Sequence, residues 1–258
     1  MSIFKGKDKS KKAKHEVRKV VGLFDLHAPL HEEPALRAAL EFIKEYKPHE
    51  LVIGGDLGEF ESISHWIQNK KRKVEGKRLA KDYDACNAIL DRIQQVLPKG
   101  CKKIYLLGNH EEWVEQYLDN FPAMEGLIDL ETGLKLNERG YKVIKLNKCY
   151  QIGKCNIIHG WYTGVHHAKK HIDNGHKNLI YGHVHDAQRF SSPSLDNFHS
   201  AISVPCMCKL NKDFLHNKPT NWSHGFLVLE VRRDGYFNAL IMDIVNGKFS
   251  YNGKVYGK

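Results

Sequence analysis

The chain has 258 residues, of which 41% are hydrophobic and 10% aromatic, a composition that suits one large core and excludes an intrinsically disordered protein. It has no run of about 18 apolar residues, which excludes a membrane-spanning helix, and its start lacks the apolar centre of a secretory signal, so we expect a cytoplasmic protein. The net charge of +10 lies mostly in two short segments.

The first half of the chain predicts alternating strands and helices. Short apolar runs bounded by Gly are typical of buried strands, and apolar residues three and four positions apart are typical of amphipathic helices. We therefore expect strands at 17–24, 51–53 and 104–107, and helices at 35–46, 79–97 and 111–118. A short helix is also expected around Ile63 and Trp66, and Pro98 and Gly100 end the long helix.

After Gly133 the pattern changes to shorter strands. They are expected at 141–146, 150–152, 155–158, 179–181, 201–204, 225–231 and 236–244, with one helix at 165–173. Asp234-Gly235 joins the last two strands and is typical of a hairpin turn. The mixture predicts an α/β (α+β) fold, in which two mixed β-sheets pack as a sandwich flanked by helices.

The two charged segments hold the basicity of the chain. Residues 1–19 contain eight Lys or Arg and two acidic residues, and residues 70–81 contain seven and one, so each segment carries +6 and the rest of the chain carries −2. Residues 1–16 have little apolar content and are interpreted as a basic flexible arm. Residues 17–258 are interpreted as a single domain, with 70–81 as a basic inserted segment.

Five short motifs stand directly behind apolar runs that we expect to be strands. They are Asp25-Leu-His27, Gly-Asp56-Leu-Gly-Glu59, Gly-Asn109-His110-Glu111, His159-Gly and Gly-His183-Val-His185. Asp and His are common ligands of first-row metals, and in α/β sheets ligands gather outside the carboxyl ends of the strands. The five strand ends therefore predict one metal site with seven candidate ligands, namely Asp25, His27, Asp56, Asn109, His159, His183 and His185.

These motifs resemble, in order, the signature of the calcineurin-like metallophosphoesterases: Asp-x-His, Gly-Asp-x-x-Asp/Glu, Gly-Asn-His-Asp/Glu, His and Gly-His-x-His. The resemblance spans residues 25–185 and implies the β-sandwich of that family. It implies that one metal ion is held by Asp25, His27, Asp56 and His185. It implies that a second is held by Asp56, Asn109, His159 and His183, so that Asp56 bridges the two ions. It also makes His110 the catalytic histidine.

A count of charges agrees with such a site. Two divalent ions, the carboxylates of Asp25 and Asp56 and a bridging hydroxide leave about one positive charge, which attracts a phosphate anion. We therefore expect a metal-bridging hydroxide to hydrolyse phosphate esters, with His110 protonating the leaving oxygen or stabilising charge. The mixed nitrogen and oxygen ligands suit manganese first, with iron, zinc, nickel or cobalt as alternatives.

Three further residues are candidates for supporting the metal ligands. Glu59 and Glu111 fill acidic positions of the signature. Glu111 is either a first-turn carboxylate favoured by the helix dipole or a group that orients His110. His31 stands close enough to the first motif to reach the mouth of the site, although a loop histidine is the simpler interpretation.

Other polar residues leave alternatives open. His167 and His171 have the spacing that can bind zinc on a helix, but two neighbouring lysines and the missing acidic partner favour a solvated basic face. Trp161 and Tyr162 either stack on a base or ring of the substrate or pack against the core. The six cysteines include no Cys-x-x-Cys pair and are interpreted as free thiols.

The substrate is expected to be a phosphodiester. The chain lacks the arginine that follows the second motif in calcineurin-type protein phosphatases, and it resembles instead compact phosphoesterases of bacteria and their phages. Basic and aromatic residues near the motifs favour nucleic acid or a nucleotide as substrate, and the candidate contacts are Lys70, Lys71, Arg72, Lys73, Lys77, Arg78, Trp161 and Tyr162. The alternatives are a small-molecule or nucleotide phosphomonoesterase and a non-catalytic nucleic-acid-binding scaffold. No membrane partner is expected, and the sequence does not determine the oligomeric state.

Overall fold

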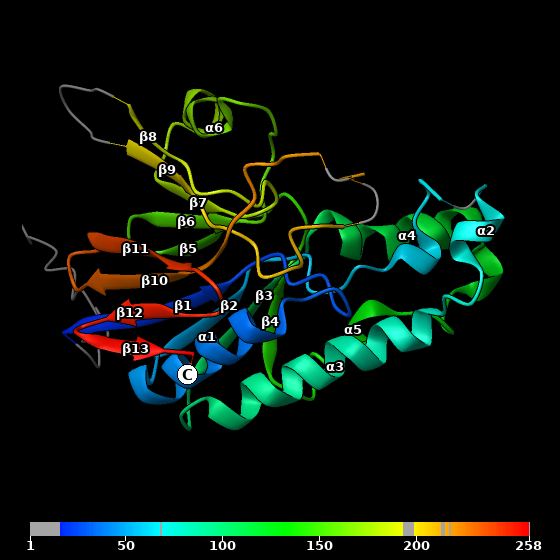
Figure 1. The fold of residues 1–258 in the computed structure, drawn as a ribbon, viewed down its shortest axis with the longest axis horizontal. Coiled ribbons are helices and arrows are strands. Elements are labelled where there is room, and N and C mark those ends of the chain that lie inside the picture. Colours follow the sequence, from blue (N-terminus) through cyan, green and yellow to red (C-terminus); the bar gives the residue numbers. More distant parts are fainter. Residues whose placement is uncertain (1–15, 68, 193–198, 213–214, 217, 258) are drawn as a thin grey trace, which may run out of the picture.

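A computed structural model describes residues 16–67, 69–192, 199–212, 215–216 and 218–257 (Figure 1). Its longer helices are α1 (Glu33–Tyr46), α3 (Leu79–Val96), α4 (Asn109–Asn120) and α6 (His167–Gly175). Two helices of one turn, α2 (Lys71–Val74) and α5 (Leu130–Gly133), and the 3-10 turns η1 (Glu61–Ile63) and η2 (Pro122–Met124) lie between them. None of the helices in these ranges is long and apolar enough to cross a membrane.

The strands form two mixed sheets. The first has the order β11-β10-β1-β2-β3-β4, in which β1 to β4 are parallel, and consists of β1 (Val17–Leu23), β2 (Glu50–Ile53), β3 (Lys102–Leu106), β4 (Tyr141–Ile144), β10 (His224–Arg232) and β11 (Phe237–Ile244). The second has the order β5-β6-β7-β9-β8 and consists of β5 (Tyr150–Ile152), β6 (Cys155–Ile158), β7 (Leu179–Tyr181), β8 (Arg189–Ser192) and β9 (His199–Ser203). A hairpin of β12 (Phe249–Tyr251) and β13 (Lys254–Tyr256) follows.

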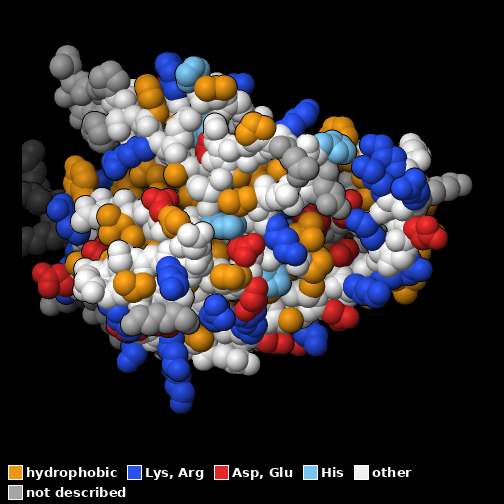
Figure 2. Space-filling model, in the orientation of Figure 1, with side chains coloured by type: hydrophobic (Ala, Val, Ile, Leu, Met, Phe, Trp, Pro, Cys, Tyr) orange, Lys and Arg blue, Asp and Glu red, His pale blue; other side chains and the backbone are white. Residues whose placement is uncertain are grey.

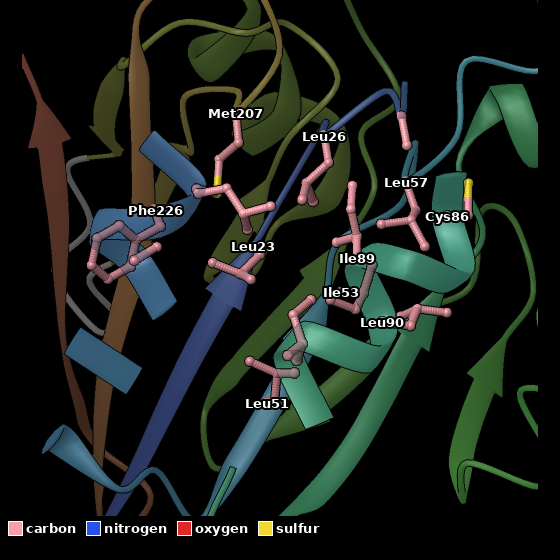
Figure 3. Packing of buried hydrophobic residues seen from close by; sticks show 14 of the residues in the cluster. Leu23, Leu26, Leu51, Ile53, Leu57, Cys86, Ile89, Leu90, Met207 and Phe226 are labelled. Carbon is pink, nitrogen blue, oxygen red and sulfur yellow. The ribbon is translucent and has the colours of Figure 1, made fainter. Parts of the chain in front are cut away.

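The two sheets pack face to face, and helices cover their outer faces (Figure 1). Along β1, Val20 faces the second sheet and Val21 faces α1 and α3, because successive side chains of a strand point to opposite faces. On the helical side, Leu23, Leu51 and Ile53 pack near Ile89 of α3 (Figure 3). The helix α6 covers the other face of the second sheet. The predicted sandwich of two mixed sheets flanked by helices is confirmed.

The predicted elements recur with small shifts at their ends, and a few were missed. Trp66 lies outside the short turn η1, and α4 begins at Asn109, two residues before its predicted start. The strands β8, β12 and β13 and the short helices α2 and α5 were not expected. The predicted arm at 1–16 lies outside the described residues except for Glu16. The assignment of 17–258 to one domain stays a prediction, and all six cysteines are free thiols.

Candidate metal centre

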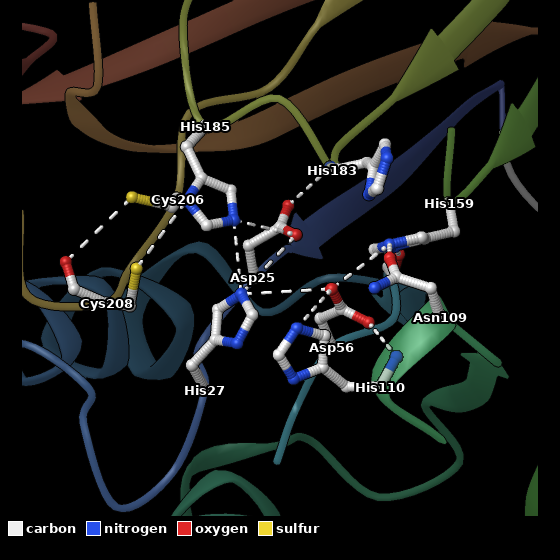
Figure 4. A network of polar contacts seen from close by, with 12 residues as sticks. Asp25, His27, Asp56, Asn109, His110, His159, His183, His185, Cys206 and Cys208 are labelled. Carbon is white, nitrogen blue, oxygen red and sulfur yellow. Dashed lines mark hydrogen bonds and ion pairs between the residues drawn. The ribbon is translucent and has the colours of Figure 1, made fainter. Parts of the chain in front are cut away.

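The five motifs meet at one edge of the sandwich (Figure 4). They follow the carboxyl ends of β1, β2 and β3 in the first sheet and of β6 and β7 in the second. All seven candidate ligands converge there, and five of them are at most 5% exposed, namely Asp25, His27, Asp56, His159 and His185. Asn109 and His183 are partly exposed and face the same space. The expected convergence at strand ends is therefore what the structure shows.

One group of donor atoms has the spacing of ligands around a single ion. The Nε2 atoms of His27 and His185 lie 3.1 Å apart, and His185 Nε2 lies 3.4 Å from Asp25 Oδ1. His27 Nε2 lies 3.8 Å from Asp56 Oδ2. Ligand atoms about 2.0–2.2 Å from a metal ion stand roughly 3–4 Å from one another. These four residues can hold one metal ion.

A second group shares Asp56 with the first. His159 Nε2 lies 3.3 Å from Asp56 Oδ2 and 3.1 Å from Asn109 Oδ1. The donor atoms of Asp56, His159 and His183 all lie within 4.8 Å of one another. Oδ2 of Asp56 therefore faces both groups, as a bridging carboxylate does.

The contacts behind the ligands fit a cation between them. His159 Nδ1 donates to the carbonyl of Gly54 over 2.9 Å, which directs Nε2 toward Asp56, where the neutral ring can offer its lone pair to a metal ion. Asp25 Oδ2 accepts from the backbone N–H of His183 over 2.8 Å, whereas its buried Oδ1, 3.4 Å from His185 Nε2, has no partner with hydrogen-bond geometry among the residues that the structure describes. A buried oxygen without a donor is costly, and a metal ion at this position would satisfy it. The residues present fit a metal site.

The negative charges of the buried carboxylates Asp25 and Asp56 favour positive charge beside them. Burial alone would lower the pKa of His159, but Asp56 and then Asp25 raise it to about 10. Burial likewise opposes the rise at His185, whose pKa Asp25 raises to about 9. At His27, burial followed by the charges of Lys212 and His110 lowers the pKa to about 3. Two buried carboxylates thus take up positive charge, either as protons on two histidines or as metal cations.

The backbone of the ligand loops is held in an uncommon conformation. Five candidate ligands have a positive φ between 50° and 71°, namely Asp25, His27, Asp56, His183 and His185. Such residues cost energy and cluster at functional sites, where the surrounding structure holds them. This strain is an independent sign that the loops serve a site.

Close approaches at two glycines hold the carboxylates in place. A Cβ at Gly108 would lie 2.1 Å from Asp56 Oδ1, and a Cβ at Gly182 would lie 2.3 Å from Asp25 Oδ2. Both carboxylates therefore lie so close to the backbone that only glycine, which has no side chain, leaves room for them. The glycines in these two motifs are needed for contact between the loops.

His110 lies beside the candidate ligands, with one ring nitrogen bonded to the backbone and the other facing Asp56. Its Nδ1 lies 2.7 Å from the carbonyl oxygen of Glu59, which can only accept, so Nδ1 carries the hydrogen. Its Nε2 lies 3.9 Å from Asp56 Oδ2, and its ring packs on Trp113 with centroids 3.9 Å apart. Nε2 is therefore the atom that can hold or release a proton toward the centre.

Glu111 joins two of the ligand loops. It accepts hydrogen bonds from the backbone N–H groups of Asp56, Leu57 and Gly108 over 2.8–2.9 Å and from the hydroxyl of Tyr105 over 2.9 Å. Three of these donors are backbone groups and the fourth is a side-chain hydroxyl, so the four contacts do not involve the ring of His110. Glu111 therefore both caps the first turn of α4 and holds the Asp56 loop against it.

Glu59 supports a ligand from behind and is itself held by a lysine that was not predicted. Glu59 Oε2 lies 3.0 Å from His27 Nδ1 and accepts a hydrogen bond from Lys212 Nζ over 2.8 Å. Lys212 is only 5% exposed. Burial opposes the ionised form of Glu59, but His27 and Lys212 lower its pKa to about 2. No sequence pattern identifies Lys212, since it stands 153 positions from Glu59.

Two other neighbours of the candidate ligands, Cys208 and Trp222, were not among the predicted site residues. Cys208 Sγ lies 3.8 Å from His185 Nδ1, so this thiol stands where a carboxylate or carbonyl often supports a metal-bound histidine. His27, His185 and Cys208 form one of the groups whose donor atoms are close enough to hold an ion. The ring of Trp222 packs on His185 with centroids 4.2 Å apart.

The remaining aromatic and histidine candidates pack elsewhere. His31 Nε2 lies 3.3 Å from Glu33 at the start of α1, and its contacts in the described ranges do not reach the ligands. Trp161 stacks on His171 with centroids 5.9 Å apart, and Tyr162 lies against the same ring. Both aromatic residues are half-buried against α6. These contacts show that both rings pack against α6, and their contact with a substrate stays a prediction.

The expectation of a solvated basic face on α6 is wrong for its two histidines, whereas Lys169 and Lys170 are exposed. His167 and His171 are 2% and 0% exposed. The acidic partner that the sequence did not identify is Asp186, whose Oδ1 lies 3.0 Å from His167 Nε2. It follows the last metal-ligand motif by one residue, so only folding brings it to the helix.

The predicted basic contacts divide into two groups. Lys and Arg side chains gather over the end of the molecule that carries α2 (Figure 2), where Lys70, Arg72 and Arg78 are exposed. Lys73 and Lys77 line a cavity next to Glu59, and Lys77 forms an ion pair with Glu61. The side chain of Lys71 lies outside the described part.

Comparisons with known proteins find relatives among phages and a similar fold among solved structures. No protein-family model matches the chain. The Gene 54 protein of Mycobacterium phage L5 is 26% identical over 260 residues, covering 93% of this chain and 98% of the relative. The Gene 54 protein of Mycobacterium phage D29 is 24% identical over 267 residues, with the same coverage.

Among solved structures, this chain is similar to Vps29 from Entamoeba histolytica and Cryptosporidium parvum. The TM-scores are 0.43 and 0.44 at 11% identity, covering 88% and 90% of this chain and 99% and 100% of those chains. A further Vps29 from Entamoeba histolytica, complexed with zinc, has a TM-score of 0.38 at 14% identity. Similarity at this level transfers neither a function nor a ligand to this chain.

Proposed function

We propose that the protein is a metal-dependent phosphoesterase that acts as a phosphodiesterase on nucleic acid or nucleotide substrates. The observation that carries the proposal is the position of Asp56 Oδ2, which faces His27 on one side and His159 on the other. A carboxylate shared by two groups of buried ligands is the arrangement that two-metal hydrolases use. Asp25, His27, Asp56 and His185 would hold one ion, and Asp56, Asn109, His159 and His183 the other.

When bound, two divalent ions activate water and stabilise the charge of an in-line displacement at phosphorus. The protein's own part is to position and to transfer a proton. Glu111 holds the Asp56 loop and α4 in register, and Glu59 orients His27. His110, fixed through Nδ1, presents Nε2 to the leaving oxygen and supplies a proton there. The lysines near Glu59 favour an anionic substrate longer than a simple monoester.

Replacement of the shared carboxylate tests the metal centre. Asp56→Asn removes a charge that both ion sites use, so we expect loss of bound metal and of hydrolysis together. Metal content by elemental analysis and hydrolysis of bis-p-nitrophenyl phosphate with added manganese measure the two effects. Asp119→Asn, at an exposed position of α4, is the matched control. Full activity in Asp56→Asn would refute the proposal.

His110 separates proton transfer from metal binding. We expect His110→Asn to lower kcat by about 10²–10⁴ while the metal content stays unchanged, because its ring faces the centre without being a needed ligand. A comparison of bis-p-nitrophenyl phosphate with p-nitrophenyl phosphate then shows whether diesters or monoesters are preferred. Higher kcat/KM on the monoester would favour a phosphomonoesterase.

A further inference from the structure

A pocket rich in lysine opens beside the candidate metal centre. Its volume is about 500 Å³, and Lys73, Lys77, Lys209 and Lys212 line it together with Leu30, Glu59, Glu61 and Asn211. Two segments supply the lysines: the stretch from α2 toward α3, and the loop after β9. Folding thus brings two lysines from the segment between β9 and β10 next to the basic segment that the sequence predicted.

One side chain separates this lysine pocket from the metal ligands. Glu59 lines the pocket, and its Oε2 lies 3.0 Å from the ring of His27 and 2.8 Å from Lys212 Nζ. A group bound in the pocket would therefore be a neighbour of the group bound at the metal centre.

The charges of the pocket do not cancel. Lys212 pairs with Glu59, and Lys77 pairs with Glu61. Lys73 and Lys209 are exposed, and neither forms an ion pair with an acidic side chain in the ranges that the structure describes. The four lysines and two glutamates leave a charge of +2, which suits a phosphate group.

An aromatic ring on the far side of the loop adds a second kind of contact. Lys209 and Asn211 also line a neighbouring cavity of about 690 Å³, whose wall includes Trp222. The ring of Trp222 touches His185, so this cavity also borders the metal centre. Lysines that bind phosphate beside an aromatic ring that can stack on an unpaired base are typical of sites for single-stranded nucleic acid.

We propose that the lysine pocket binds the phosphate next to the scissile one in a single strand of nucleic acid. This inference rests on the proposed phosphodiesterase function. In this inference, Lys73 and Lys209 determine specificity: they favour a polymeric substrate over a diester that contains a single phosphate. Lys212 is a positioning residue, since it acts on the centre through Glu59.

The double variant Lys73→Gln, Lys209→Gln tests the pocket, with Lys44→Gln, Lys99→Gln as the matched control. Lys44 and Lys99 are exposed: Lys44 lies in the last turn of α1 and Lys99 shortly before the amino end of β3, away from the candidate ligands. Activity is measured on a single-stranded oligonucleotide and on bis-p-nitrophenyl phosphate, which has no second phosphate. We expect the ratio of the two kcat/KM values to fall about tenfold in the double variant and to stay constant in the control.

Binding gives a second readout without turnover. Fluorescence anisotropy of the same oligonucleotide, measured without metal at several salt concentrations, should show about tenfold weaker binding and a salt slope smaller by about 0.7, the value for one lost phosphate contact. If the double variant left both the activity ratio and the oligonucleotide affinity unchanged, the proposal that the lysine pocket binds a phosphate of the strand would be overturned. Absence of hydrolysis of both substrates by the unmodified protein would instead overturn the proposed function and this inference with it, whatever the binding result.

Discussion

At the scale of single residues, the candidate site depends on a buried carboxylate that is not itself a ligand. Glu111 offers both oxygens to four donors, three of them backbone N–H groups from two different loops. Burial, with Asp56 next, raises the pKa of Glu111, and the amide donors act against that rise. The residue therefore links the geometry of the site to the stability of the fold.

We expect Glu111→Gln to lower the free energy of unfolding by about 2–4 kcal/mol, because the amide nitrogen would face donors that lose their acceptor. Urea unfolding measures the change. Glu115→Gln, at an exposed position of the same helix, should stay within about 0.5 kcal/mol of the unmodified protein. Equal effects of the two changes would contradict this role.

The raised pKa values of two ligands predict that metal binding depends on pH. Without metal, His159 and His185, with pKa values of about 10 and 9, are protonated at pH 7. A metal ion needs their neutral form, so binding should release up to about two protons, and affinity should rise as the pH increases from 7 toward 9. Calorimetry in buffers of different ionisation enthalpy measures the release. No proton release at pH 7 would contradict this prediction.

At the scale of elements, parallel strands bring distant motifs to one edge. The strands β1, β2 and β3 run in parallel, as do β6 and β7, so the residues that follow each strand meet where the sheets end. Apolar side chains of the first sheet pack on both of its faces, against the helices on one side and the second sheet on the other. The loops then need close backbone contact to bring their carboxylates together.

Gly108 tests this contact between loops. We expect Gly108→Ala to push Asp56 aside and to weaken metal binding about tenfold or more, because its Cβ would lie 2.1 Å from Asp56 Oδ1. Metal titration measures the effect. Gly100→Ala is the control: its Cβ would meet nothing within 4 Å, so its positive φ of 79° should reduce stability by about 1–2 kcal/mol and leave metal affinity unchanged.

At the scale of the whole molecule, the site ties the two sheets together. Asp25 and Asp56 come from the first sheet, and His159, His183 and His185 come from the second. Ions held between them would therefore bind only the assembled sandwich, and a ligand that binds only the folded state stabilises it by mass action.

Metal removal should accordingly lower the melting temperature. At a free metal concentration about 1,000 times Kd, binding contributes about 4 kcal/mol, which corresponds to roughly 10 °C for a chain of this size. Scanning calorimetry with manganese and with a chelator measures the difference. Asp56→Asn should show little of this shift, and an equal shift in that variant would place the metal elsewhere.

The sequence by itself determined most of the strands and the ligand motifs. Both are local patterns: an apolar run bounded by glycine predicts a strand, and a polar residue behind it needs no partner to be recognised. The seven candidate ligands and His110 were found in this way, and the structure brings them together.

The tertiary structure alone decided which groups surround those ligands. Lys212 on Glu59, Cys208 and Trp222 beside His185, and Asp186 on His167 are pairs whose burial and charge depend on contact and leave no periodic signal in the chain. For the same reason the sequence predicted only the basic segment that supplies Lys73 and Lys77 to the lysine pocket. It did not predict that Lys209 and Lys212 line the same pocket. Short motifs and their chemistry can be predicted from neighbouring residues in the sequence. Tertiary packing determines which distant residue shifts a pKa or completes a pocket.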